Sequence, residues 1–491
     1  MSSGKWLVVA IGLSVAVLPG GASAQVVAAR DTIGLSLAEA LDRSIERSEE
    51  VRIAQAQVDR ARAQVGSARS NLLPQVNTQL GYTRTLRSVF QGGGFEIPDS
   101  LRFEPDSTAS TAERLRYLEQ NTPNAAFEAL GGLFSGLPFG QEHTWNASAT
   151  LQQALFAPAA VSGVQLARRA AEAARASYEE AVSDVTLQVT EAYLGAALAE
   201  QTAEIVAASV ELAAAHLEQV RLQFDAGTAS ELDVLRAEVE LENLRPQLAQ
   251  ANNGRDLAVA NLKRLVNIPA ETEVRLTTPL TGPGALAVGD VDLPTLEEAA
   301  SVLQARASVR AARANVAMME EQADIARSAF LPAVYLQGNM ARQAFPSGFL
   351  PGGNDWRDDW NVGFAVSWPL FQGMRRKAEV DAANAQVRQA ELQAAQLEEG
   401  VRLEYDRALR ELERARLQLE AAGTTVSQAQ RVYDLTELRY REGLATQLDV
   451  SDARLALQQA RLNEVTAYHD YQLALASALR ALGRPATELV R

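Results

Sequence analysis

The chain has 491 residues, enough for more than one ordinary domain, and carries a formal net charge of −15. It contains no cysteine, which excludes disulfides, zinc–thiolate sites, cysteine nucleophiles and a lipid anchor on an N-terminal cysteine. The acidic balance argues against nucleic acid as a partner and would favour cations in a water-filled passage.

The N-terminal residues have the pattern of an export signal. Lys5 supplies a short basic start, residues 6–18 form an apolar stretch, and Ala-Ser-Ala at residues 22–24 offers the small side chains that a signal peptidase prefers. We predict a signal peptide over residues 1–24, with a retained N-terminal anchor as the alternative. No later run of about 18 apolar residues follows, so the sequence predicts no transmembrane helix.

Two parts of the chain follow one plan. The helical patterns that begin at Leu37 and Leu296 both end in Leu-Pro-x-Val, so that Pro74 matches Pro332 at a helix–strand junction. Three further matches follow in the same order: residues 145–156 with 360–371, 224–234 with 440–450, and 261–269 with 477–485. Shared composition does not explain four matches in one order. We therefore predict a first repeat over residues 25–268, a linker over 269–294, a second repeat over 295–485 and a tail over 486–491.

Each repeat is predicted to contain a helix, two strands, a long helix, a turn and a further helix. In the first repeat the helices lie near 35–71, 159–224 and 229–268, and the strands near 75–85 and 145–156. In the second repeat the helices lie near 295–330, 374–441 and 446–483, and the strands near 333–342 and 361–371. The linker is rich in Pro and Gly and has no strong period. A long loop over 85–143, with a short helix near 111–120, separates the first two strands.

The predicted strands alternate between apolar and polar residues. Val76 and Leu80 share one face, and Asn77 and Gln79 share the other. This alternation over about ten residues is typical of barrel strands that face lipid outward and water inward, although a soluble antiparallel sheet with one wet face is the alternative. The signal peptide and the repeat favour the barrel. We expect three tryptophans in the aromatic belt at the bilayer surface: Trp145, Trp360 and Trp368.

Four strands are too few to close a barrel, since the smallest common barrels use about eight. An open sheet edge inside lipid would leave backbone groups without hydrogen bonds. Several chains must therefore share one barrel, and three chains would supply twelve strands. The fold class expected is an α+β membrane protein: a trimeric 12-stranded β-barrel with four strands per chain, continued by a long α-helical barrel and built from two internal structural repeats.

The two long helices of about 65 residues would each extend roughly 100 Å. Their narrow apolar stripes and many alanines favour lateral packing on other helices. The shorter helices are little more than half as long, so two stacked end to end would match one long helix. These helix lengths favour a hollow cylinder of long helices beside stacked short ones. A soluble coiled-coil scaffold is the alternative, but it leaves the paired strands unexplained.

These features together resemble the TolC family of outer-membrane efflux and secretion channels, over nearly the whole mature chain. The resemblance implies an outer-membrane homotrimer in contact with outer-membrane lipid, its helical part in the periplasm. It also implies docking with a periplasmic adaptor (membrane fusion) protein and with an inner-membrane transporter of the resistance–nodulation–division (RND) or ABC class. In that family the two helix–turn–helix tips contact the adaptor. The matching residues here are Gly227, Thr228, Ala229, Gly443, Leu444 and Ala445.

The resemblance also implies an entrance at these tips. Asp449 and Asp452 match aspartates that line the narrow periplasmic aperture, where three copies would raise some of the carboxyl pKa values by mutual repulsion. Asp233 and Tyr440 match residues that bond the two tip hairpins together. The basic partner usual in the family falls at Ala445, so that ion pair is absent, and we predict that Arg236 replaces it.

An enzyme is not expected. The sequence has three histidines, His143, His216 and His469, which are far apart, and it has no Gly-rich phosphate loop, no nucleophile elbow and no metal-ligand cluster. We therefore predict no cofactor and no metal. The predicted function is the exit duct of a tripartite efflux or type I secretion system. The alternative is a periplasmic coiled-coil adaptor or structural protein, and the cargo stays open.

Overall fold

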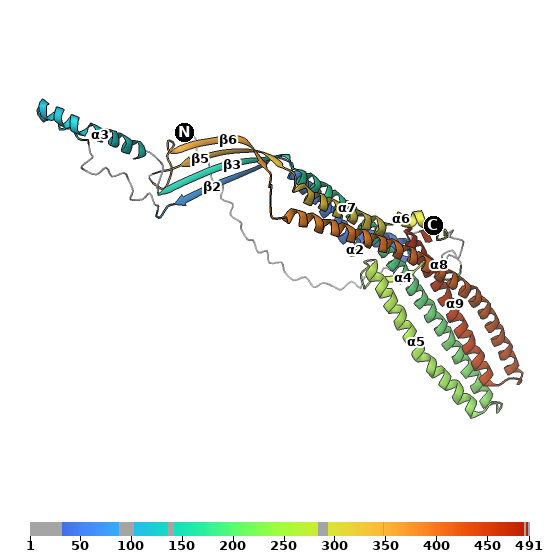
Figure 1. Cartoon of the computed structure of the whole chain (residues 1–491). Helices are drawn as coiled ribbons and strands as arrows, with labels where there is room; N and C mark the ends of the chain where they lie inside the picture. Colours follow the sequence, from blue (N-terminus) through green and yellow to red (C-terminus); the bar gives the residue numbers. More distant parts are fainter. Residues whose placement is uncertain are drawn as a thin grey trace, which may run out of the picture.

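The computed structural model describes residues 32–87, 103–135, 142–282, 293–346, 348–485 and 488–489. The predicted signal peptide lies outside these residues. The molecule is elongated, with a β-sheet toward one end and a long helical bundle toward the other (Figure 1). Helix α3 (Thr111–Ser135) projects beyond the sheet, and the predicted segment near 111–120 was too short.

The main sheet is antiparallel with the strand order β2-β3-β5-β6. Its strands are β2 (Gln75–Arg84), β3 (His143–Phe156), β5 (Ala333–Ala344) and β6 (Trp356–Ser367). Each repeat contributes one hairpin-like pair, and the pairing of β3 with β5 joins the two repeats at the centre. Consequently β2 and β6 are the two edges.

The register separates the side chains of the sheet into a polar face and an apolar face. One row across all four strands consists of Asn77, Thr150, Asn339 and Asn361, and the next row on that face contains Gln75, Gln152 and Gln337. The opposite face carries the row Val76, Leu151, Gly338 and Val362. On that face Val362 and Phe364 are 75% and 73% exposed. A sheet with one amide-rich face and one exposed apolar face needs a different medium on each side.

Two helices run the length of the bundle, as predicted. Helix α4 (Pro158–Asp225) has 68 residues and α8 (Arg375–Arg441) has 67, so each extends about 100 Å. In the half nearer the sheet α4 packs on α2 (Glu49–Ser70) and α7 (Ala307–Ser328). In the other half it packs on α5 (Glu231–Leu265) and α9 (Gln447–Leu482), so shorter helices follow one another along a long one (Figure 1).

The helices predicted near 35–71 and 295–330 are each divided, so both predictions are wrong as single helices. Ser48 separates α1 (Leu37–Arg47) from α2 with ψ 133°, and Arg306 separates α6 (Ala300–Gln304) from α7 with ψ 145°. One residue with extended ψ changes the helix direction without a Gly or Pro. The two breaks occupy equivalent positions, as many residues before Pro74 as before Pro332.

The linker contains a strand that its sequence pattern did not predict. Strand β4 (Glu273–Leu276) pairs in parallel with β1 (Thr32–Leu35) beside the middle of the bundle. The buried Tyr193 hydroxyl donates to the Leu35 carbonyl (3.0 Å) and accepts from the Thr278 amide (2.9 Å), which fixes this small sheet on α4. The bounds of the strand predicted near 361–371 are wrong, because β6 starts at Trp356 and ends at Ser367, before Pro369. Among the described residues, no helix is apolar and long enough to span a bilayer.

Candidate functional site

The two helical turns farthest from the sheet have the same backbone structure. Gly227 and Gly443 have φ +75° and +73°, the left-handed conformation that ends a helix. The amide after each glycine donates back to the long helix: Thr228 N–H to the Gln223 carbonyl (2.8 Å) and Leu444 N–H to the Arg439 carbonyl (2.7 Å). The six predicted tip residues lie in these two turns. Leu444 is 69% exposed, so this end offers an apolar contact.

Each helix after a turn begins with a reciprocal capping box. The Thr446 amide and hydroxyl both donate to the Asp449 carboxylate (2.7 Å each), and the Asp449 amide donates to the Thr446 hydroxyl (3.3 Å). Ser230 and Asp233 repeat this arrangement in α5. These bonds to the hydroxyl and amide hold the pKa values of Asp449 and Asp233 below the ordinary range for Asp. In the single chain the Asp449 pKa therefore moves opposite to the rise expected from repulsion in a trimer.

Tyr440 joins the two hairpins, but not through the predicted partner. Its hydroxyl donates to Gln223 Oε1 (3.1 Å), and its ring lies 5.8 Å from the ring of His216. Burial, and to a smaller extent the charge of Asp233, raise the pKa of Tyr440. The carboxylate of Asp233 is occupied by Ser230 instead.

Arg236 and Asp452 line one groove between α5 and α9, with a volume of about 640 Å³. No hydrogen bond or ion pair joins them in the part of the chain that the structure describes. The apolar lining of the groove includes five side chains that are each between 50% and 60% exposed: Leu232, Leu235, Val239, Leu448 and Leu455. The predicted entrance residues thus gather at one end of the bundle, with a leucine-rich surface around them.

The sequence analysis did not predict a buried ion pair that lies beside this groove. Arg454 of α9 is 4% exposed and pairs with Glu240 of α5, whose other carboxylate oxygen accepts from the Ser451 hydroxyl (2.9 Å). Burial lowers the pKa of Arg454 to about 10, which still leaves the guanidinium charged at neutral pH. The sequence around Arg454 could have indicated this pair. Arg454 lies among the buried Val450, Ala453 and Leu457, where a charge requires a partner.

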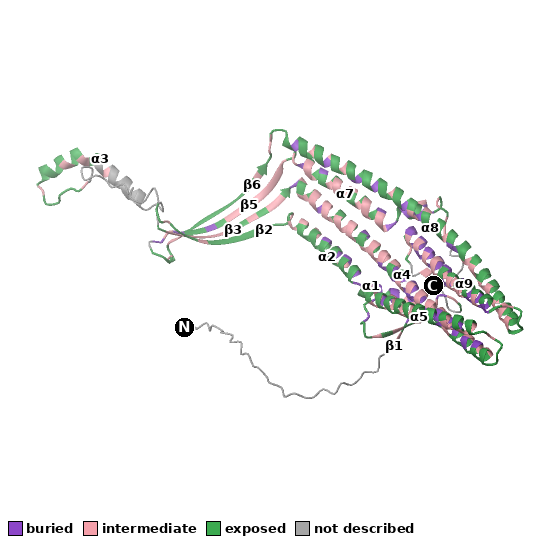
Figure 2. Cartoon of the chain, turned by 90° about the horizontal axis from the view of Figure 1, so that it is seen from below, coloured by how far each residue is buried: buried purple, intermediate pink, exposed green. Residues whose placement is uncertain are grey.

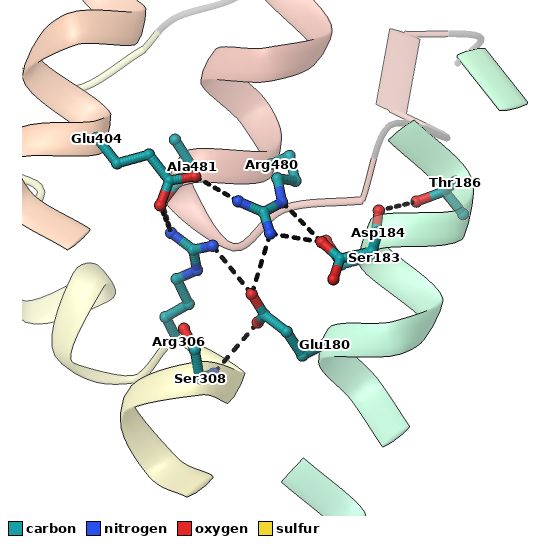
Figure 3. Close-up of polar contacts among 9 residues, drawn as sticks. All are labelled: Glu180, Ser183, Asp184, Thr186, Arg306, Ser308, Glu404, Arg480 and Ala481. Atoms are coloured by element: carbon teal, nitrogen blue, oxygen red, sulfur yellow. Dashed lines mark hydrogen bonds and ion pairs between the residues drawn. The ribbon is translucent and has the colours of Figure 1, made fainter. Parts of the chain in front are cut away.

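A second charged cluster joins the repeats near mid-length (Figure 3). Arg306 is 5% exposed and donates to Glu180 (3.0 Å) and Glu404 (2.7 Å). Arg480 bonds the same two carboxylates and Asp184. The cluster therefore joins α4 of the first repeat to α7, α8 and α9 of the second.

The remaining predicted residues lie in or near the sheet. Pro74 and Pro332 directly precede β2 and β5. Trp145 packs 5.0 Å from Tyr82 near the loop end of the sheet. Trp360 is 67% exposed on the apolar face, and Trp368, at the helix end, donates its Nε1–H to the Phe330 carbonyl (3.1 Å). The described residues contain no group of three or more histidine or carboxylate side chains placed to share a metal ion.

A two-faced sheet continued by a long helical bundle in two repeats defines a class: outer-membrane channel proteins with a periplasmic helical extension. The family model described as "Outer membrane efflux protein" matches residues 40–267 and 299–484. The chain therefore belongs to the outer membrane efflux protein family, whose members form trimeric efflux or secretion channels that work with adaptors and inner-membrane transporters.

Individual relatives are distant. Protein CyaE of Bordetella pertussis is 27% identical over 319 residues, which are 64% of this chain and 65% of CyaE, just under two thirds of its length. Outer membrane protein TolC of Vibrio cholerae is 22% identical over 91% of this chain and 90% of its own. Among solved structures, the open state of the Neisseria gonorrhoeae MtrE outer membrane channel superposes with a TM-score of 0.71 at 20% identity, covering 92% of this chain and 89% of MtrE.

Proposed function

We propose that this chain is one third of an exit duct through the outer membrane, conducting cargo passively from the periplasm to the exterior. The observation that carries the proposal is the two-faced sheet with two unpaired edges. Among the residues that the structure describes, strands β2 and β6 have partners on one side only, and their apolar face is exposed. Inside lipid each free edge is costly, and further copies of the chain would pair both.

The internal repeat supports closure by a head-to-tail contact. Because β2 corresponds to β5 and β3 to β6, the pairing of β3 with β5 predicts that β6 pairs with β2 of the next copy. A heterologous contact of this kind generates a ring when the rotation closes. Three copies would close twelve strands, within the range of known barrels.

The helices support the same contact. Helices α4 and α8 are equivalent, yet α4 is largely buried or half-buried and α8 is mostly exposed (Figure 2). Ala176 of α4 is 3% exposed, whereas its equivalent Leu392 in α8 is 71% exposed. Since α4 packs on α7, we infer that the matching face of α8 packs on α2 of the next copy.

The tip residues and the groove between α5 and α9 support the proposal that this end of the bundle lies in the periplasm and docks with partners. The six tip residues and the exposed leucines would form the docking end for a periplasmic adaptor and an RND or ABC transporter. Asp449 and Asp452 would stand around the aperture in three copies, and Arg236 would act there in place of the basic residue missing at Ala445. Sparse Met and His offer no relay for metal ions along the passage, and the cargo stays open.

Planar-bilayer recording of the purified mature protein tests this proposal. We expect single-channel conductance from a detergent-resistant trimer, and a change in that conductance in Arg236→Ala. A water-soluble monomer that does not fractionate with membranes would contradict the channel and favour the periplasmic adaptor or structural protein. Heat-modifiable gel mobility is the companion measurement, because a barrel resists mild detergent and a coiled coil does not.

A further inference from the structure

The loop between β6 and α8, residues 368–374, carries exposed apolar side chains. Pro369 lies just after the end of the strand, because it has no amide hydrogen for the ladder. Four apolar side chains of the loop are between 55% and 80% exposed: Trp368, Leu370, Phe371 and Met374. The loop lies where the sheet meets the helical bundle (Figure 1). Since the helices of this outer-membrane channel extend into the periplasm, the loop is at the periplasmic edge of the sheet.

The loop extends the apolar face of the sheet toward the helices. The exposed apolar residues of β6 run from Trp360 to Val366, which is about 20 Å along the strand. Beyond Trp360 the same face ends at the ion pair of Arg342 with Asp358 (2.6 Å). A tilted strand segment of that length covers about 15 Å of an apolar band that is about 25 Å tall in membrane barrels. The loop residues would supply the missing height.

The first repeat indicates that assembly would leave this surface exposed. Leu155 and Phe156 occupy the positions of Leu370 and Phe371 in the repeat. Strand β3 has a partner strand on each side, yet Leu155 and Phe156 are 53% and 49% exposed. Because the next copy would flank β6 in the same way, we expect Leu370 and Phe371 to remain at the surface of the trimer.

The first three residues of α8 are all basic: Arg375, Arg376 and Lys377. Arg376 is 8% exposed, and its guanidinium donates to the carbonyls of Ala329 (3.0 Å) and Leu370 (2.7 Å). The guanidinium carbon also lies 4.8 Å from the centre of the Phe330 ring. Within the described part of the chain no carboxylate pairs with Arg376. A buried cation without a carboxylate partner favours an anion close by.

The two neighbours of Arg376 present their charges at the surface. The side chains of Arg375 and Lys377 are 65% and 70% exposed, and each has an exposed partner one turn along α8, at 3.7 Å and 3.1 Å. Exposed pairs of this kind contribute little, so both cations can bind an external anion. The first repeat has no counterpart, because the first basic residues of α4 are Arg168 and Arg169.

We propose that the β6–α8 loop and the start of α8 bind an anionic phospholipid of the periplasmic leaflet, one molecule per chain. The acyl chains pack on Leu370 and Phe371, in continuity with the lipid along the sheet. The phosphate accepts hydrogen bonds from Arg375 and Lys377, and its charge compensates that of Arg376. This inference rests on the proposed placement of the apolar sheet face in lipid.

Native mass spectrometry of the purified trimer in a zwitterionic detergent tests the site. With added dioleoyl phosphatidylglycerol we expect up to three lipids to remain bound per trimer, and with the phosphatidylcholine of the same chains none. Arg375→Gln combined with Lys377→Gln should weaken retention about tenfold, because two contacts to the phosphate are lost. Arg168→Gln combined with Arg169→Gln removes the same charge from α4 and should retain the lipid.

The other outcomes overturn the proposal. Equal retention by the Arg375/Lys377 variant and the wild type would exclude these cations, and equal losses in both double variants would indicate a general attraction. Retention of phosphatidylcholine would exclude a headgroup site, and displacement by inorganic phosphate would indicate a site for a free anion. A trimer that conducts but retains no phosphatidylglycerol contradicts this inference alone, whereas a protein that does not enter membranes contradicts the channel.

The depth of the loop can be measured separately, because the natural chain has no cysteine. A fluorophore on Phe371→Cys should be quenched by nitroxide-labelled acyl chains in vesicles that contain phosphatidylglycerol. The same fluorophore on Gln386→Cys, about 16 Å beyond the first residue of α8, is the control and should not be quenched. An unquenched label at position 371 would place the loop outside the lipid and overturn the proposal.

Discussion

The two aspartates in the first turns of α9 have different surroundings, although we propose the aperture as the place of both. Asp449 accepts two hydrogen bonds from Thr446, whereas no hydrogen bond occupies the Asp452 carboxylate in the described structure. Capping lowers the pKa of Asp449, and repulsion around a three-fold aperture would raise it. We expect the cap to dominate for Asp449, because its bonds are short and local.

This expectation fixes the sign of a pH effect. A carboxyl pKa that is lower in the folded state contributes stability above the unfolded pKa of about 3.9, and the contribution is lost as the pH falls through the folded value. Asp449→Asn should therefore weaken the amide-exchange protection of residues 447–452 at pH 7, and this difference from the wild type should shrink as the pH is lowered below the unfolded pKa. Asp452→Asn is the control and should leave this protection unchanged over the same pH range. Greater protection of Asp449→Asn at pH 7 would mean that repulsion dominates.

The sequence predicts those residues of the site whose partners are near in the chain. The turn residues at Gly227 and Gly443 follow from patterns a few residues long. Glu240 and Arg454 are 214 positions apart, and their contact depends on how α5 and α9 are rotated about their axes. The spacing of the apolar residues in α9 shows that Arg454 faces inward, but it does not identify the partner of Arg454.

At the scale of elements, the sequence did not predict the helix breaks at Ser48 and Arg306, because neither residue is a Gly or a Pro. At Arg306 the break accompanies a tertiary contact: its side chain lies in the buried cluster with Glu180 and Glu404. Likewise, β4 has four residues and is stabilised by β1, which is distant in sequence. Long helices were predictable because their period repeats over many turns.

The cluster at the second break makes a matched stability prediction. Arg306→Ala would leave Glu180 and Glu404 with Arg480 as their shared partner, so we expect a loss of about 3 kcal/mol, the lower end for a broken buried pair. Arg310→Ala breaks the exposed pair with Glu179 one turn away and should cost less than about 1 kcal/mol. Denaturant midpoints of the helical circular dichroism signal in detergent measure both. Equal losses would contradict a special role for the buried cluster.

At the scale of the whole molecule, the polarity of each face of the sheet determines whether that face contacts lipid or water. Val362 and Asn361 are neighbours in β6 on opposite faces, so they form a matched pair. Val362→Arg would place a charge in lipid at a cost of about 2–4 kcal/mol and should prevent folding into the membrane. Asn361→Arg would point into water and should leave assembly intact while altering ion selectivity. Heat-modifiable mobility and conductance measure the two outcomes, and tolerance of Val362→Arg would contradict the assignment of faces.

Closure of the ring has a definite register. Carrying the pairing of β3 with β5 over to the equivalent strands places Val366 opposite Leu80 of the next copy, and Phe364 opposite Tyr82. This register keeps apolar residues on one face across the junction, and a slip by one residue would place them opposite polar ones. Ala365 then faces Gly81 of the next copy on the polar side.

Cysteines at these two positions test the closure. Ala365→Cys with Gly81→Cys should oxidise to covalent trimers, because directly opposed residues in antiparallel strands have Cβ atoms about 4.5–5.5 Å apart. Asn361→Cys with Gly81→Cys is the control: four residues of offset put the sulfur atoms roughly 13 Å apart, so no bond should form. Cross-linking of the control pair alone would indicate another register, and cross-linking of neither would mean that β6 and β2 of different copies do not meet, which leaves both sheet edges unpaired and removes the physical basis of the channel.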